Sequence, residues 1–143
     1  MTPSIEKTIQ KLGYAGLIPF ALLALLMWLV DEDLLPFVAV ALAGYGAVIV
    51  SFLGGIHWGL GFVRGDDSAR LHFVWGVGPS LLAWLSLLMP PHAGLPLIGL
   101  LLLACYAVDR KVYPTAGLAQ VLPMRLQLTV VATLSCMLGA AAI

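Results

Sequence analysis

The chain has 143 residues, of which 62% are hydrophobic and 10% are charged, and its formal net charge is zero. A composition this apolar leaves too little polar surface to cover a soluble domain, so it predicts an integral membrane protein whose first partner is the lipid bilayer. The few basic residues are spread over three segments, which argues against nucleic acid as a partner.

Long apolar runs predict an all-α fold, a bundle of five transmembrane helices that forms a single transmembrane domain over residues 1–143. Barrel strands would instead alternate polar and apolar residues. The first run stops at the acidic residues 31–33, the second begins with Pro36 in its first turn, and the third stops at Pro90. We expect the fourth to be the shortest, because charged residues begin at Asp109. The predicted spans are about 12–30, 36–63, 71–89, 95–108 and 123–143.

Lysine and arginine occupy only alternate connections between the predicted spans. They lie before the first span, between the second and third, and between the fourth and fifth: Lys7, Lys11, Arg64, Arg70, Arg110, Lys111 and Arg125. The positive-inside rule therefore places the N-terminus in the cytoplasm and the C-terminus on the opposite side. We expect a multi-pass protein of the bacterial inner (plasma) membrane, or of the mitochondrial inner membrane if the chain is eukaryotic.

Small residues recur at every fourth position of the second span. This ridge predicts a helix-packing face, because small side chains let another backbone approach closely in the membrane. The partner is either another helix of the chain or another subunit, and general enrichment of alanine and glycine in membrane helices is the competing explanation. The packing residues are Ala39, Ala43, Ala47, Ser51, Gly55 and Gly59.

Polar and aromatic residues gather at the predicted cytoplasmic rim. His57 precedes Arg64 by two helical turns, so it lies about 10 Å deeper on the same helix face. Asp109 is the acid at the end of the fourth span, and a pair with His57, Arg64 or Arg125 would satisfy an otherwise costly buried group. A structural clamp, a site for a small ligand or quinone-like head group, and a metal or haem site all remain open. The candidate cluster is His57, Trp58, Arg64, Asp109 and Arg125.

Spacing disfavours a metal or a cofactor in this cluster. His72 lies two residues inside Arg70, whereas His57 lies seven inside Arg64, so we expect a depth difference of about 7 Å that prevents the two histidines from flanking one haem. Metal-ligand spacings such as His-x-x-His and Cys-x-x-Cys are absent, as are phosphate-loop and Gly-x-Ser-x-Gly motifs. We therefore predict no metal, no cofactor and no catalytic residue.

Four segments carry a resemblance to a known family. They are Leu12 to Phe20, Tyr45 to Gly59 with its Gly-Gly-Ile-His-Trp-Gly core, Gly78 to Leu81, and Asp109 followed by Leu122 to Leu126. The chain resembles a domain-of-unknown-function family of small five-span membrane proteins, found in proteobacteria and in the mitochondrial inner membrane of eukaryotes. The resemblance marks His57, Trp58, Pro79, Asp109 and Arg125 as positions of the family pattern. It implies location and architecture but no activity, and residues 118–121 depart from the aromatic residues that the family has there.

Two functions follow as hypotheses. The favoured one is a non-enzymatic inner-membrane accessory or assembly factor that docks its small-residue faces against other membrane proteins or against itself. The alternative is a small oligomeric channel or transporter with its pathway between subunits and His57 and Asp109 near the cytoplasmic mouth. Ionisable residues are missing from the predicted midplane, which argues against transport by a single chain.

Overall fold

The computed structural model describes residues 1–143 and contains helices but no strands, which confirms the all-α prediction. Five helical segments are long and apolar enough to cross a membrane, and the chain is therefore a multi-pass helical membrane protein. Its helices are α1 (Pro3–Ala15), α2 (Leu17–Leu29), α3 (Leu35–Arg64), α4 (Arg70–Leu88), α5 (Pro91–Val112) and α6 (Leu122–Ala141), with short 3-10 helices η1 (Asp67–Ala69), η2 (Tyr113–Ala116) and η3 (Ala119–Val121).

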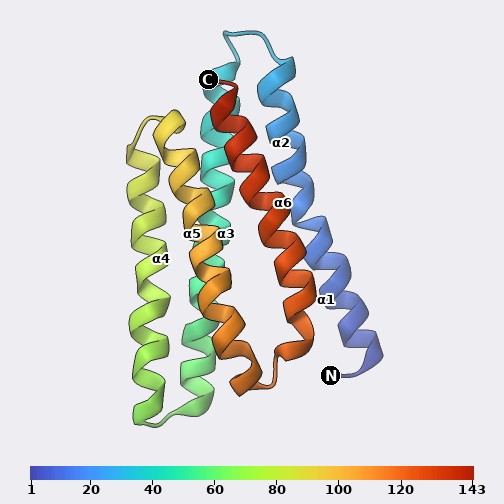
Figure 1. Cartoon of the computed structure of the whole chain (residues 1–143), viewed down its shortest axis with the longest axis vertical. Helices are drawn as coiled ribbons and strands as arrows, with labels where there is room; N and C mark the ends of the chain where they lie inside the picture. The colour runs from blue at the N-terminus through green and yellow to red at the C-terminus, as the bar shows by residue number, and fades with distance from the viewer.

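The first crossing starts earlier than expected and is divided into α1 and α2. It begins at Pro3, where the Thr2 hydroxyl accepts a hydrogen bond from the third residue of the helix. It is interrupted at Gly16, because Pro19 has no N–H to donate to the carbonyl four residues earlier. No residue of α1 is buried, and this half of the crossing lies at the edge of the bundle (Figure 1).

Helix α5 is longer than the expected span of residues 95–108. It starts at Pro91, because a proline in the first turn has no intrahelical hydrogen bond to lose. At its other end it runs through the charged residues to Val112. Asp109 does not end the helix because its side chain, 1% exposed, is paired inside the bundle.

Helix α3 is the centre of the bundle. It packs against α2, α4, α5 and α6, whereas α4 lies at one edge and α1 at the other (Figure 1). Large side chains of α3 and α5 that are completely buried, such as Leu42, Val50 and Ile98, fill the core between these helices. Close packing of these apolar side chains, through dispersion contacts, holds the crossings in a fixed arrangement.

The small-residue ridge of α3 divides into two parts. Ala39, Ala43 and Ala47 are buried inside the bundle. Gly55 and Gly59 are exposed, and a Cβ atom added to either would meet no neighbour within 4 Å. The ridge therefore serves packing within the chain only in its first half.

A different glycine pair makes the closest contact between α3 and α4. A Cβ atom added to Gly54 would lie 2.5 Å from the carbonyl oxygen of Gly76, and one added to Gly76 would lie 2.7 Å from that of Gly54. Both positions need glycine because the two backbones touch there.

The segments that carry the basic residues lie together at one end of the bundle, which we call the basic end. Figure 1 shows the N-terminus, the α3–α4 connection and the α5–α6 connection at this end, and the C-terminus at the other. We therefore expect reporter fusions to place the N-terminus and both of these connections in the cytoplasm, and a C-terminal reporter to be active on the opposite side. A cytoplasmic C-terminal reporter would mean that one of the five segments does not cross.

Candidate functional site

A cluster of polar side chains is buried between four helices near the basic end. It contains His57 from α3, His72 from α4, Asp109 from α5, Tyr113 from η2 and Arg125 from α6, and none of them is more than 7% exposed. We call these five residues the buried cluster. Polar groups this deep are tolerated only when they bind one another.

Asp109 is the centre of the buried cluster. Its Oδ1 lies 2.6 Å from Nε2 of His57, and its Oδ2 accepts a hydrogen bond of 2.6 Å from Nη1 of Arg125. The carboxylate therefore binds one partner on each oxygen, and the guanidinium balances its charge. Arg125 Nη1 also donates to the Tyr113 hydroxyl at 2.8 Å.

His57 extends this network to α4. A carboxylate only accepts hydrogen bonds, so Nε2 of His57 carries the proton that faces Asp109. The Nδ1 atoms of His57 and His72 are 3.2 Å apart, so one of them donates to the other. With both imidazoles neutral, the donor is His72. The chain of contacts from Arg125 through Asp109 and His57 to His72 ties α6, α5, α3 and α4 together.

The contact between the two histidines corrects the depth expected from the sequence. That expectation placed Arg64 and Arg70 at equal depth. In the structure, α3 and α4 run antiparallel, with Gly54 beside Gly76 and His57 beside His72. This register places Arg70 beside the helical turn that precedes Arg64, so Arg70 lies about 6 Å deeper in the bundle than Arg64 does. The imidazoles touch each other directly, so they do not flank a space for a porphyrin.

Comparison with known proteins agrees with this architecture. A family model described as "Protein of unknown function (DUF3429)" matches residues 5–141. The chain belongs to the DUF3429 family. This confirms the resemblance to a five-span family. Transmembrane protein 69 of Xenopus tropicalis is 44% identical to this chain over 79 residues. The match covers 54% of this chain and 31% of transmembrane protein 69. No solved structure matches.

Two of the sequence-predicted residues of this DUF3429 protein lie outside the buried cluster. Trp58 is 40% exposed, and its indole N–H donates to the Phe73 carbonyl oxygen at 3.1 Å, which attaches α3 to α4. Arg64 is exposed at the end of α3 and makes no ion pair with Asp109. In the connection between α3 and α4, just beyond Arg64, a hydrogen bond from the Ser68 hydroxyl lowers the pKa of Asp66.

His72 and Tyr113 were missing from the cluster predicted for this DUF3429 chain. The signal for Tyr113 was present in the sequence, because it follows Asp109 by four residues and therefore shares its helix face. His72 could not be found in this way, since its position depends on the axial shift between α3 and α4.

The buried cluster combines a strong ion pair with two imidazoles and a phenol, but it holds no activated serine or cysteine nucleophile. The groups of the buried cluster can form hydrogen bonds. They are suited to holding the helices together as a clamp, or to binding an oxygen acceptor.

Proposed function

We propose that this membrane protein is a non-enzymatic accessory or assembly factor that docks other membrane proteins against the outer face of α3. The observation that carries the proposal is the exposed pair Gly55 and Gly59, one helical turn apart, with free space where their side chains would be. Two small residues at this spacing allow a partner helix to approach closely, so that dispersion contacts can form in lipid.

Nothing within the chain explains these glycines. The contact with α4 uses Gly54, on a different side of α3, and Gly55 and Gly59 have no neighbour that an alanine would displace. A glycine inside a helix costs about 0.5–1 kcal/mol relative to alanine, so an unused glycine has no structural benefit in the isolated chain. A partner helix that packs closely on this face would explain why both positions are glycine.

The buried cluster has a supporting part in this proposal. It attaches α3 to three other helices near the basic end and so fixes the orientation of the docking face. His57 and Asp109 are each 1% exposed inside one chain, a position that does not support the alternative of a channel mouth between subunits. We place the protein in the bacterial inner membrane, or the mitochondrial inner membrane of a eukaryote, with the basic end in the cytoplasm or matrix.

Gentle extraction of the tagged chain from native membranes tests this function. We expect the parent to migrate as a complex with other membrane proteins, and Gly55→Leu to lose that complex because leucine pushes the partner helix away. The control is Val74→Leu, which changes a 68% exposed side chain on α4 rather than on the docking face of α3. Unfolding in detergent should be the same for all three proteins. A complex that survives in Gly55→Leu contradicts the proposal, and a symmetric homo-oligomer of the parent favours the channel.

A further inference from the structure

A large cavity lies beside the buried cluster and is not explained by the docking face. It measures about 530 Å³ and is formed by α1, α2, α3, α5 and α6, together with the segment between α5 and α6. Sixteen of the twenty residues that line it are hydrophobic, so its contents must be largely apolar. Its volume falls within the range of about 300–1,000 Å³ that is usual for sites of small organic ligands.

The cavity is elongated along the bundle axis. On one side its wall extends from Val121, the last residue of η3, to Ala132 of α6, and on the first crossing it extends from Ile9 to Phe20. Eleven residues of helix correspond to about 16 Å. This length is close to half of the hydrocarbon core of a bilayer, about 30 Å thick, so the cavity has the depth of one lipid leaflet.

The cavity is open toward the bilayer between α1 and α3. Helix α1 packs mainly against α2 and α6. Leu12 of α1 is 70% exposed and Phe52 of α3 is 65% exposed, and both line the cavity. An apolar chain can therefore enter sideways from the lipid without crossing a polar barrier.

One polar side chain of the cavity wall has a nitrogen without a partner. Arg125 lines the cavity and is 6% exposed, and its Nη2 is the one buried side-chain nitrogen or oxygen without a hydrogen bond. Its Nη1 already serves Asp109 and Tyr113. Buried N–H donors are nearly always satisfied, because an unmade hydrogen bond costs free energy. Nη2 thus marks where an oxygen acceptor belongs, and Thr129 adds a hydroxyl to the cavity wall one turn further along α6.

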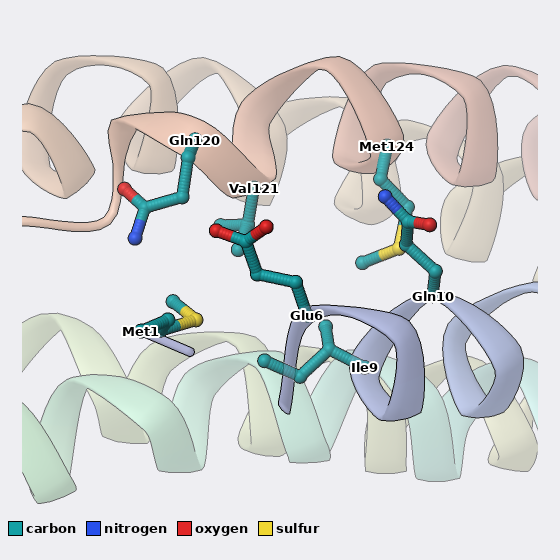
Figure 2. A pocket seen from close by; sticks show the side chains of 7 residues that line it. All are labelled: Met1, Glu6, Ile9, Gln10, Gln120, Val121 and Met124. Carbon is teal, nitrogen blue, oxygen red and sulfur yellow. The ribbon is translucent and has the colours of Figure 1, made fainter. Parts of the chain in front are cut away.

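A second, small cavity extends this arrangement to the basic end. It measures about 90 Å³ and shares Met1, Ile9, Val121 and Met124 with the large one. Figure 2 shows Glu6 and Gln10 from α1 facing Gln120 and its neighbours across this space. Along the bundle axis, the polar side chains of the small cavity therefore come first, then Arg125, and then the apolar part of the large cavity. A membrane lipid has the same sequence of groups, from a polar head group through an ester to an apolar chain.

The charge of the site selects the kind of acceptor. Asp109 already neutralises Arg125, so an anionic head group would add an unbalanced charge in a medium of low dielectric constant. We propose that this cavity binds a membrane amphiphile with a long apolar chain, whose uncharged carbonyl oxygen accepts a hydrogen bond from Arg125 Nη2. Two membrane compounds share this chemistry, an isoprenoid quinone and the acyl ester of a glycerolipid.

Native mass spectrometry of the full chain tests this site. After delipidation in detergent, the protein is titrated separately with a quinone that carries a ten-carbon tail, with dipalmitoyl phosphatidylcholine, whose head group has no net charge, and with palmitate. We expect one molecule of the quinone or of the diacyl lipid to bind saturably, and the better of the two identifies the source of the carbonyl. Saturable binding of palmitate alone, or of none of the three, overturns the proposal.

Variants distinguish binding in this cavity from nonspecific binding of lipid to the protein surface. Ile56→Trp fills the cavity and should lower the bound fraction at least tenfold, whereas Val63→Trp, two turns further along α3 and 89% exposed, should bind like the parent. Arg125→Lys keeps the charge beside Asp109 but removes the second nitrogen, and it should weaken binding about tenfold. Thermal unfolding measured without ligand shows that each variant is folded. Folded Ile56→Trp that binds with the parent's affinity rules out the cavity as the site.

Discussion

Asp109→Ala should lower the free energy of unfolding by about 3–5 kcal/mol, because it leaves a buried guanidinium and a buried imidazole without their common partner. Arg125 is 6% exposed and His57 is 1% exposed, so water cannot replace the lost carboxylate without opening the bundle. Reversible unfolding in mixed micelles, followed by circular dichroism, measures the loss. The control is Asp67→Ala, since Asp67 is fully exposed and lies 4.0 Å from Arg70, and it should change stability by no more than about 0.5 kcal/mol.

A double-mutant cycle tests whether His57 and Asp109 act as one unit. We expect His57→Ala to destabilise the protein and His57→Gln to recover part of the loss by restoring a hydrogen bond. Once Asp109 is removed, His57→Ala should add little, because the interaction between them is already gone. Additive losses would mean that the pair does not act as a clamp. A stable His57→Ala protein that fails to complement a deletion strain would instead assign His57 to a functional site.

Gly54→Ala should destabilise the protein by about 1–3 kcal/mol, because the added methyl group forces α3 and α4 apart. Its Cβ would lie 2.5 Å from a backbone oxygen, which cannot move aside as a flexible side chain can. The adjacent Gly55→Ala is the matched control. No atom lies within 4 Å of the added methyl group, so this change should leave stability unchanged or raise it by up to about 1 kcal/mol.

The same unfolding measurement compares the two alanine variants. A large loss in Gly54→Ala with none in Gly55→Ala is the expected outcome. Equal losses at both positions would mean that α3 packs against another element through the Gly55 face, and that the packing of α3 against α4 is not as described.

The sequence by itself determined the class of the protein and most of its helical segments. Composition identified a helical membrane protein, and the predicted span of residues 36–63 differs by one residue at each end from α3, Leu35–Arg64. These features depend on local properties, since apolar length, prolines and flanking charges act on the helix that contains them. The same local reasoning failed at α5, where charged residues continue the helix to Val112 because Asp109 finds partners on other helices.

Only the tertiary structure decided which side chains meet. The rotation of each helix about its axis and its shift along a neighbour result from packing between segments distant in sequence, and no local pattern encodes them. The contact of His57 with His72 depends on the shift of α4 against α3, and the exposure of Gly55 depends on the rotation of α3. The cavity beside Arg125 depends on both, because it exists only where several helices leave space that their side chains do not fill.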